Sequence, residues 1–395
     1  MEQFSKWADA AEAGRDELIA LRRAIHSEPE LGLDTPRTRD KLEAALAGLP
    51  LTIRRSDRTS GFIAVLEGRA PGRSVLLRGD MDALPIHEAT GLEFASREAG
   101  KMHACGHDSH SAMLAGAAKI LCGQRERIAG RILFMFQPGE EGHHGARIML
   151  EEGLLGDPLP DAAFALHIWP TLPHGAVACR AGTMLASTDT LRARIVGKGG
   201  HAAMPHDAID PVPVAAEVVL ALQSEVARRT PVTDPIVLSI SCIHAGATHN
   251  VLPDAVELTG TLRTLSSEGR ARGREAFERI CTHVAVAHGC TAEVIVEPGY
   301  PPTVNDPRAV SLVREMAGAD FIELPASNMG GEDFSYVLEK VPGAMAFLGV
   351  APEGEEARAR APLHNPAMMI DERVLPKGVA LHCAFATRFL EKGWE

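Results

Sequence analysis

The spacing of apolar side chains changes several times between a helical and a strand rhythm. Over residues 3–28 apolar positions recur every three to four residues, which predicts one amphipathic helix. Continuous apolar runs at 131–136 and 162–166 predict strands buried on both faces of a parallel sheet. Further elements are predicted as helices at 37–46, 109–122, 146–152 and 377–390 and strands at 61–66, 74–77 and 347–350. Alternating strands and helices predict an α/β layered domain with a mostly parallel central sheet.

The rhythm differs between about residues 185 and 297. The predicted elements there are a strand at 188–196, a helix at 211–229, strands at 236–243 and 255–263, a helix at 267–288 and a strand at 292–297. The order β-α-β-β-α-β is that of a ferredoxin-like unit. We therefore expect a discontinuous catalytic domain of residues 1–184 and 298–395, interrupted by a smaller domain of residues 185–297. The polar stretch 352–360 is predicted to be an exposed loop.

Composition narrows the possible partners and the compartment. The 395 residues carry 40 basic and 52 acidic side chains, a formal charge of 40 − 52 = −12, and only 4% are aromatic. These values disfavour nucleic acid and anionic membranes as partners. The seven cysteines are odd in number and form no C-x-x-C pair, and no apolar stretch has signal-peptide or membrane-spanning length. We expect a soluble cytoplasmic protein with reduced thiols.

Acidic and imidazole side chains follow the predicted strands at the point where each one ends. These residues are Asp80, Asp82, Glu140, Glu141 and His167. Because functional groups gather at the carboxyl ends of strands in such sheets, the pattern predicts one shared site.

Cys105 and His107 lie two residues apart, directly before a predicted helix. Thiolate and imidazole, combined with carboxylates, suit ions such as Zn, Mn or Ni. The same segment could instead be a polar turn in which Asp108 or Ser109 caps the helix.

Glu140 and Glu141 are neighbouring carboxylates at a strand end, a costly arrangement unless a cation or a proton holds them together. One could bind metal while the other acts as general base on the attacking water. A solvated acidic turn is the alternative. His167 and His364, taken singly, could equally be ordinary core or surface histidines.

The set as a whole contains one thiolate, three imidazoles and one or two carboxylates, more than one four-coordinate ion needs. It therefore predicts two divalent ions sharing a water molecule. Metal-bound histidines need an acceptor for their other ring nitrogen, and Asp82 and Asp108 are candidates, although either could be a turn or helix cap.

At these residues the chain resembles the M20 metallopeptidase family, in the aminoacylase or amidohydrolase branch that includes hippurate hydrolases. The matching stretches run in family order over nearly the whole chain: 77–85, 102–110, 137–142, 166–170, 199–206, 248–253, 330–334 and 363–366. As a set they are highly specific, and no proposed ligand position departs from the family pattern.

The resemblance implies roles for individual residues. The implied metal ligands are Cys105, His107, Glu141, His167 and His364, with Glu140 as the base and Cys105 as our choice of bridging ligand. It also implies that the inserted domain is a lid and dimerisation domain, from which His201 reaches the oxyanion of the tetrahedral intermediate in the partner subunit.

Other matching residues would bind the substrate. The resemblance assigns Asn250 and Arg263 to the substrate carboxylate, which an arginine can hold with two hydrogen bonds, and places Gly331 at the substrate as well. Without the family, a surface ion pair for Arg263 and a turn position for Asn250 would be the preferred interpretations. His206 and Asp210, which lie near His201 in the sequence, could serve only lid packing.

The implied activity is hydrolysis of the amide bond of N-acyl-amino acids, such as hippurate or N-acetyl-amino acids, by water held between two ions of Mn, Zn, Ni or Co. A homodimer or a dimer of dimers through the lid is expected. A dinuclear dipeptidase acting on unblocked dipeptides is the alternative, although the Cys105 ligand distinguishes this branch from the peptidase branches. A non-catalytic binding protein on the same scaffold predicts a missing ligand or base, and none is missing.

Overall fold

The computed structural model describes residues 2–351 and 361–395, so the loop predicted at 352–360 lies outside the described residues. The described chain divides into two compact units. The large unit comprises the chain up to Met184 together with Val304–Ala326 and Asp333–Glu395, and the small unit comprises Leu185–Thr303 and Ser327–Glu332. Short strands β7 (Gly182–Leu185) and β14 (Thr303–Asn305) lie where the chain passes between the units.

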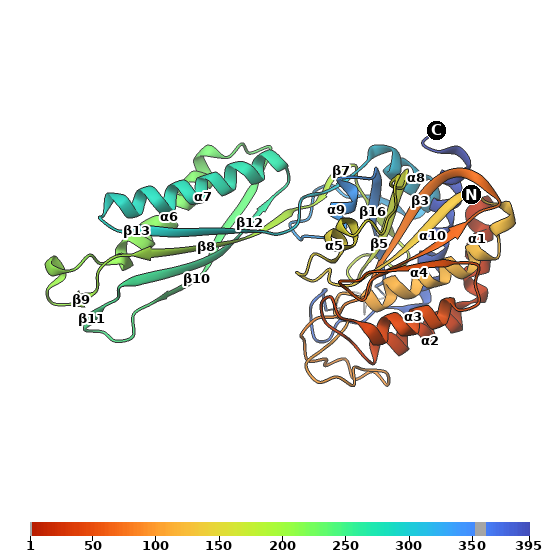
Figure 1. Ribbon diagram of the computed structural model, residues 1–395, viewed down its shortest axis with the longest axis horizontal. Coiled ribbons are helices and arrows are strands. Elements are labelled where there is room, and N and C mark those ends of the chain that lie inside the picture. The colour runs from red at the N-terminus through yellow and green to blue at the C-terminus, as the bar shows by residue number, and fades with distance from the viewer. Residues whose placement is uncertain (1, 352–360) are drawn as a thin grey trace. The chain divides into compact units, whose positions relative to one another are not determined.

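A central sheet organises the large unit (Figure 1). Within the described residues it has eight strands in the order β1-β2-β4-β3-β5-β16-β6-β15. Their bounds are β1 Thr52–Arg55, β2 Phe62–Glu67, β3 Ala70–Asp80, β4 Ala129–Gln137, β5 Ala162–Trp169, β6 Val177–Cys179, β15 Phe321–Glu323 and β16 Gly343–Gly349. Pairs β3/β4, β3/β5, β5/β16 and β6/β15 are parallel, whereas β1/β2, β2/β4 and β6/β16 are antiparallel. The predicted α/β class with a mostly parallel sheet is confirmed.

Helices cover this sheet. Their bounds are α1 Glu2–Ala13, α2 Arg15–His26, α3 Pro36–Leu46, α4 His107–Cys122, α5 Gly145–Glu151, α8 Pro307–Ala317, α9 Ser335–Leu338 and α10 Leu375–Lys392. Helices α4 and α10 pack against each other and against β3, β4 and β5. The rings of Phe385 on α10 and Phe164 on β5 stack at 4.5 Å, which joins this helix to the sheet in the apolar core.

The single helix predicted over residues 3–28 was wrong, because α1 ends at Ala13 and α2 begins at Arg15. Gly14 separates them, and glycine loses more backbone entropy in a helix than any other residue. Helix α8 was missed, although Asp306 caps it by accepting the backbone N–H of Arg308 and Pro307 occupies its first position.

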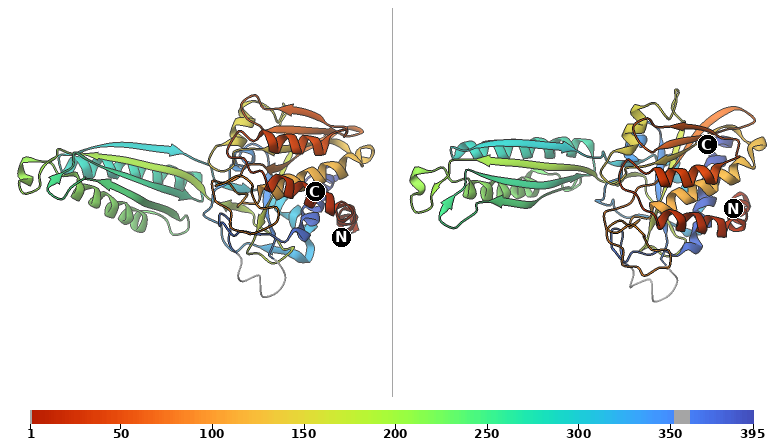
Figure 2. Two further views of the ribbon diagram at one scale, coloured as in Figure 1. Left: turned by 90° about the horizontal axis from the view of Figure 1, so that it is seen from below. Right: turned by 60° about the horizontal axis from the view of Figure 1, so that its bottom comes forward.

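The small unit has the predicted ferredoxin-like element order. It consists of β8 (Ser187–Val196), α6 (Pro211–Arg229), β10 (Ile236–Ala245), β12 (Ala255–Thr264), α7 (Ser267–Ala287) and β13 (Thr291–Pro298). The strands form an antiparallel sheet in the order β10-β12-β8-β13, and α6 and α7 pack on it (Figure 2). Buried Leu191, Val218 and Phe277 belong to the core between them. A separate two-stranded ribbon joins β9 (Gly200–His201) to β11 (Val251–Leu252).

Candidate metal centre

Parallel pairing brings three strand ends of the large unit to one edge of the sheet. Asp80, the last residue of β3, is in register with Gln137, the last residue of β4. Glu140 and Glu141 follow three and four residues later. Strand β5 is the other parallel neighbour of β3 and carries His167 near its carboxyl end. The expectation that these polar residues share one edge is therefore confirmed.

A glycine turn delivers Cys105 and His107 to this edge. Gly106 has φ +85°, and a Cβ added there would lie 2.4 Å from Cγ1 of Ile168. Only glycine allows both this backbone conformation and this close approach. Helix α4 begins at His107 with Gly106 as its N-cap, so neither Asp108 nor Ser109 caps it.

The side chain of Asp108 points into a different buried network. Its Oδ2 accepts hydrogen bonds from Nε of Arg22 at 2.7 Å and from Nδ1 of His26 at 2.8 Å. The N-cap of α4 is Gly106 and not Asp108, although Oδ1 of Asp108 accepts the N–H of Ser109 at 2.9 Å in the first turn. Its contacts with Arg22 and His26 tie α4 to α2, and Asp82 remains the carboxylate nearer to His107.

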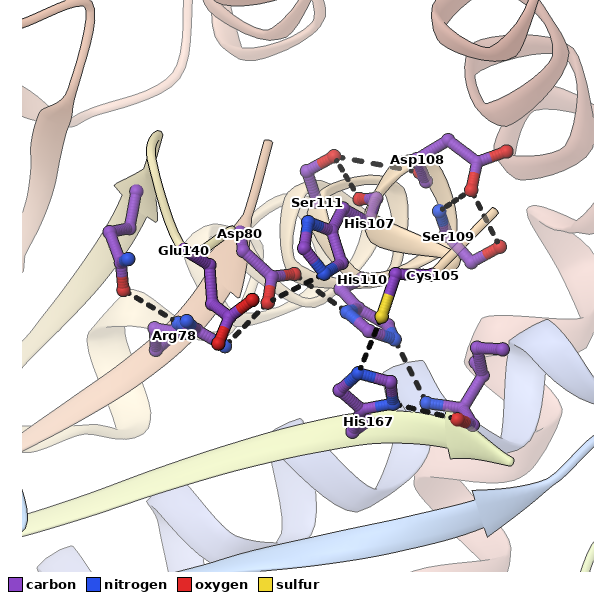
Figure 3. Close-up of polar contacts among 12 residues, drawn as sticks. Arg78, Asp80, Cys105, His107, Asp108, Ser109, His110, Ser111, Glu140 and His167 are labelled. Carbon is purple, nitrogen blue, oxygen red and sulfur yellow. Dashed lines mark hydrogen bonds and ion pairs between the residues drawn. The ribbon is translucent and has the colours of Figure 1, made fainter. Parts of the chain in front are cut away.

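The Cys105 thiol stands between two imidazoles that come from distant parts of the chain. Its Sγ lies 3.4 Å from Nε2 of His167 and 3.3 Å from Nε2 of His364 (Figure 3 shows the former contact). The same nitrogen of His364 is 3.2 Å from Oε1 of Glu141. The candidate ligand atoms lie within 4.8 Å of one another in three overlapping groups: Cys105, His107 and His167; Cys105, Glu141 and His364; and His107, Glu140 and Glu141.

Unpaired polar atoms show that this donor set fits a divalent metal. Within the described residues, neither ring nitrogen of His107 has a hydrogen-bond partner, although both atoms are buried. Buried polar groups are ordinarily paired, and thiol, imidazole and carboxylate are the donors that transition ions prefer. These residues therefore fit a divalent metal.

The charges around Cys105 and His107 also favour a bound cation. Burial, together with the carboxylates of Glu141 and Glu140, raises the pKa of the Cys105 thiol well above its usual value. Burial alone lowers the pKa of His107, but the carboxylates of Asp80 and Asp82 outweigh it and raise that pKa to about 10. Carboxylates thus surround the Cys105 thiol, and a cation bound there would offset their charge and favour the thiolate.

Asp82 positions the two glutamates through their backbone. Its Oδ1 accepts the N–H of Glu140 and its Oδ2 accepts the N–H of Glu141, both at 3.0 Å. The Glu140 side chain is buried and Glu141 is largely so, which contradicts a solvated acidic turn. The Oδ1 atom also lies 3.5 Å from Nδ1 of His107, so one carboxylate touches both halves of the cluster.

Arg263 and Gly331 adjoin each other within the small unit. A Cβ added at Gly331 would lie 3.5 Å from Nη1 of Arg263 and 2.2 Å from Cγ2 of Thr188. Burial lowers the pKa of Arg263, and its guanidinium has no hydrogen-bond or ion-pair partner within the described residues. The surface ion pair considered for Arg263 is therefore contradicted.

His201 and Asn250 form a second pair in the small unit. The backbone carbonyl of Asn250 accepts the N–H of Ala202 at 3.1 Å. His201 is exposed, and its Nδ1 accepts the N–H of Ala203 at 3.1 Å, which leaves Nε2 as the protonated nitrogen of the neutral ring. This pair adjoins the amino end of β12, whereas Arg263 lies eight residues further along, roughly 27 Å away at 3.4 Å per residue. A single chain thus keeps Asn250 and Arg263 apart.

Asp210 and His206 lie near His201 in the sequence. Asp210 caps α6 by accepting the N–H of Val212 at 3.0 Å. His206 is exposed, in a short 3-10 helix over Pro205–Asp207. Among the described residues, neither side chain belongs to a group of possible metal ligands.

Comparison with known proteins assigns the class of site. The family model described as peptidase family M20/M25/M40 matches residues 76–388. The chain belongs to the M20 family. An IAA-amino acid hydrolase of Arabidopsis thaliana is 39% identical over 95% of this chain and 86% of its own length. An N-acetyl-L-cysteine deacetylase of Bacillus subtilis is 36% identical over 96% of this chain and 89% of its own. A solved Bacillus subtilis structure, described as a dinuclear metal binding peptidase from the M20 family, is 34% identical with a TM-score of 0.82, covering 96% and 99% of the two chains.

These findings confirm the family resemblance and the enzyme class. The M20 chain is an amide-hydrolysing metalloenzyme, and its candidate ligand groups support divalent metal binding. No helix in the described part of the chain is both long and apolar enough to cross a membrane.

Sequence reasoning assigned no role to three buried residues at this centre. His110 Nδ1 lies 2.6 Å from Asp80 Oδ1, and Arg78 Nη1 lies 2.6 Å from Asp80 Oδ2 (Figure 3). Asp333 accepts from Nη2 of Arg78 at 3.2 Å. Two signals were present: His110 follows His107 by three residues, hence on the same helix face, and Arg78 precedes Asp80 by two, hence on the same strand face.

Proposed function

We propose that this M20 enzyme hydrolyses the amide bond of an N-acyl-amino acid, releasing a carboxylate and a free amino acid. The observation that carries the proposal is the buried Cys105 thiol, shared between His167 and His364 beside the Glu140–Glu141 pair. The two relatives named for IAA-amino acids and N-acetyl-L-cysteine support this substrate class.

We propose two divalent ions of Mn, Zn, Ni or Co, held by Cys105, His107, Glu141, His167 and His364. Cys105 is the proposed bridge because its Sγ belongs both to the group with His107 and His167 and to the group with Glu141 and His364. The dinuclear description of the solved relative supports the number of ions. When bound, the ions would polarise the amide carbonyl and acidify the attacking water.

Glu140 is the proposed proton carrier. Its carboxylate belongs to a group with His107 and Glu141, so it can lie beside water at the metal centre without being needed as a ligand. It takes a proton from that water and gives it to the amine as the C–N bond breaks. The hydrogen bond from its backbone to Asp82 fixes its position.

Arg263 and Gly331 are the proposed site for the substrate carboxylate. The half-buried guanidinium has no partner in the described chain, and an arginine fork matches a carboxylate. Gly331 keeps the space beside Nη1 free of a side chain.

His201 and Asn250 are proposed to serve the site of a partner subunit in a homodimer, or in a dimer of dimers, formed through the small unit. The support is their position at the end of β12 opposite to Arg263 and the free Nε2 donor of His201, which suits a developing oxyanion. Mixing inactive His201→Ala and Glu140→Gln subunits should restore part of the activity. Confirmed heterodimers without recovery would contradict action across subunits.

A substrate comparison, two variants and metal exchange test the reaction itself. Hippurate and N-acetyl-amino acids should be hydrolysed, whereas unblocked dipeptides and acyl amides lacking the carboxylate should not, and preferential cleavage of dipeptides would overturn the proposal. Glu140→Gln should abolish turnover with metal content unchanged, while Arg263→Lys should raise KM far more than it lowers kcat. Chelation followed by addition of Mn, Zn, Ni or Co should remove and restore activity and identify the preferred ion.

A cytoplasmic location is proposed as well. All seven cysteines are free thiols in the described chain, and six of them are buried. Free thiols suit a reducing compartment.

A further inference from the structure

His110 lies one helical turn after His107 on α4 and is fully buried between Asp80 and strand β5 (Figure 3). Its Nδ1 is 2.6 Å from Oδ1 of Asp80, and its Nε2 is 2.8 Å from the backbone nitrogen of Ile168. By distance alone His110 groups with Asp80 and His107 as a possible ligand. Both of its ring nitrogens, however, already have hydrogen-bond partners.

The partners of His110 determine its tautomer. The backbone N–H of Ile168 can only donate, so the Nε2 atom that faces it must be the unprotonated acceptor. Nδ1 therefore carries the hydrogen and donates it to Asp80. No lone pair of His110 remains for a metal ion.

The backbone carbonyl of the same residue, Ile168, determines the tautomer of His167. Nδ1 of His167 lies 2.7 Å from the carbonyl oxygen of Ile168, which can only accept, so Nδ1 carries the hydrogen. Nε2 of His167 is then unprotonated and faces the Cys105 thiol at 3.4 Å. The backbone of Ile168 thus joins the two imidazoles, whose centroids lie 4.5 Å apart, through the N–H of the His167–Ile168 peptide and the C=O of the Ile168–Trp169 peptide.

Close packing leaves this arrangement little freedom. The Ile168 side chain fills the space beneath Gly106, where a Cβ would approach it to 2.4 Å. On the other side, a Cβ at Gly79 of β3 would lie 2.8 Å from the carbonyl oxygen of His110, so α4 rests directly on the strand. A shift of the Ile168 backbone would therefore reach both His167 and the turn that carries Cys105.

We propose that His110 is a positioning residue of the metal centre: by accepting the backbone N–H of Ile168 while donating to Asp80, it holds the backbone of this residue, whose C=O fixes the tautomer and ring orientation that present Nε2 of His167 as a ligand. The inference rests on the proposed ligand role of His167. Hydrogen-bonded partners of ligating histidines typically contribute about 10–100-fold in metal affinity.

Two amide variants separate the two contacts of His110. In His110→Gln the side-chain carbonyl can take the place of Nε2 and accept the Ile168 N–H. In His110→Asn the shorter amide can still donate to Asp80 but leaves Ile168 unheld. The readout is Co²⁺ affinity of the metal-free protein in competition with a chelator, followed by the thiolate-to-cobalt absorption of Cys105.

The expected result is that His110→Asn binds Co²⁺ about 10–100-fold more weakly, while His110→Gln binds like the wild type. His382→Phe is the matched control, because His382 is equally buried but its ring nitrogens have no hydrogen-bond partner within the described residues. This control should keep wild-type Co²⁺ affinity. Wild-type Co²⁺ affinity in His110→Asn, or equal losses of affinity in the Asn and Gln variants, would overturn the proposed role of His110. Either result would leave the proposed metal centre standing.

If the wild-type protein shows no cobalt–thiolate absorption, the proposed metal centre fails and this inference fails with it.

A measurement on the unmodified chain keeps the test independent of variant folding. Long-range ¹H–¹⁵N spectra of the metal-free protein should show His110 with Nδ1 protonated and Nε2 bare, and the opposite tautomer would overturn the proposal.

Discussion

The carboxylate of Asp82 accepts the backbone N–H of Glu140 at 3.0 Å, across 58 residues of sequence. Its second oxygen accepts the neighbouring N–H of Glu141 at the same distance. One side chain on the loop after β3 therefore determines where both glutamates of the loop after β4 stand, and it does so without occupying their carboxylates.

Asp82→Asn tests this relationship. The amide NH₂ cannot accept a hydrogen bond, so one of the two backbone N–H groups loses its partner and the glutamate it carries is free to move. We expect kcat to fall about 10–100-fold with little change in KM, measured on the metal-loaded enzyme. Asp306→Asn is the control, since Asp306 also accepts a backbone N–H, from Arg308 at 2.8 Å, but at the surface start of α8. Equal kcat in both variants would contradict the positioning role.

Gly106→Ala should loosen the metal centre. The added Cβ meets Cγ1 of Ile168 at 2.4 Å, and φ +85° is unfavourable for alanine at a cost of about 1 kcal/mol or more. We expect a lower melting temperature and reduced metal content after dialysis. Gly100→Ala is matched in backbone conformation, with φ +77°, but has no atom within 4 Å of the new Cβ, so it should keep its metal. Adding Ile168→Ala to Gly106→Ala should recover part of the loss, and no recovery would rule out the steric explanation.

Gly331→Ala should weaken substrate binding through Thr188. The new Cβ would lie 2.2 Å from Cγ2 of Thr188, so the segment beside Arg263 must shift. We expect KM for an N-acyl-amino acid to rise about tenfold or more, because small misplacements of binding groups are costly. Gly330→Ala, whose Cβ would approach Oδ1 of Asn328 only to 3.1 Å, is the control. In the double variant Gly331→Ala/Thr188→Ser the clashing methyl group is absent, and a KM that stays high there would exclude Thr188 as the cause.

Asp189 should make the stability of the small unit depend on pH. Burial alone raises the pKa of Asp189, but hydrogen bonds from Arg270 and Arg274 outweigh it and lower that pKa below its usual value. Because the folded-state pKa is the lower one, the stabilisation is complete above about pH 4 and is lost as the pH falls through the folded-state pKa.

Asp189→Asn therefore should lower the melting temperature most at neutral pH, since breaking a buried ion pair costs about 3 kcal/mol. Calorimetry from pH 7 down to about pH 3 should show the gap between variant and wild type narrowing with acidification. Glu293→Gln, which removes an exposed partner of Arg194, should have little effect at any pH. A gap for Asp189→Asn that is constant with pH would show that the charge is not responsible.

Short-range pattern was sufficient for much of the fold and failed where the signal was short or interrupted. Buried strands such as β4 and β5 were predicted because their apolar runs exclude most alternatives. The strands β6 and β15 were missed because three residues are too short to show a period-two pattern of apolar side chains. The first helix was predicted as continuous because apolar spacing persists across Gly14 while the backbone does not.

The sequence by itself determined the ferredoxin-like element order of the small unit, the buried strands of the large unit and the donor types at the strand ends, since these depend on residues only a few positions apart. Tertiary structure alone decided that Cys105 meets His364 across 259 residues, that Asp108 turns toward Arg22 and that His110 holds the peptide beside His167. These relationships depend on strand pairing and on the approach of α4 to β3 and β5, which no local pattern records. Periodicity reflects the geometry of one element, whereas the distance between two side chains depends on the packing of every element between them.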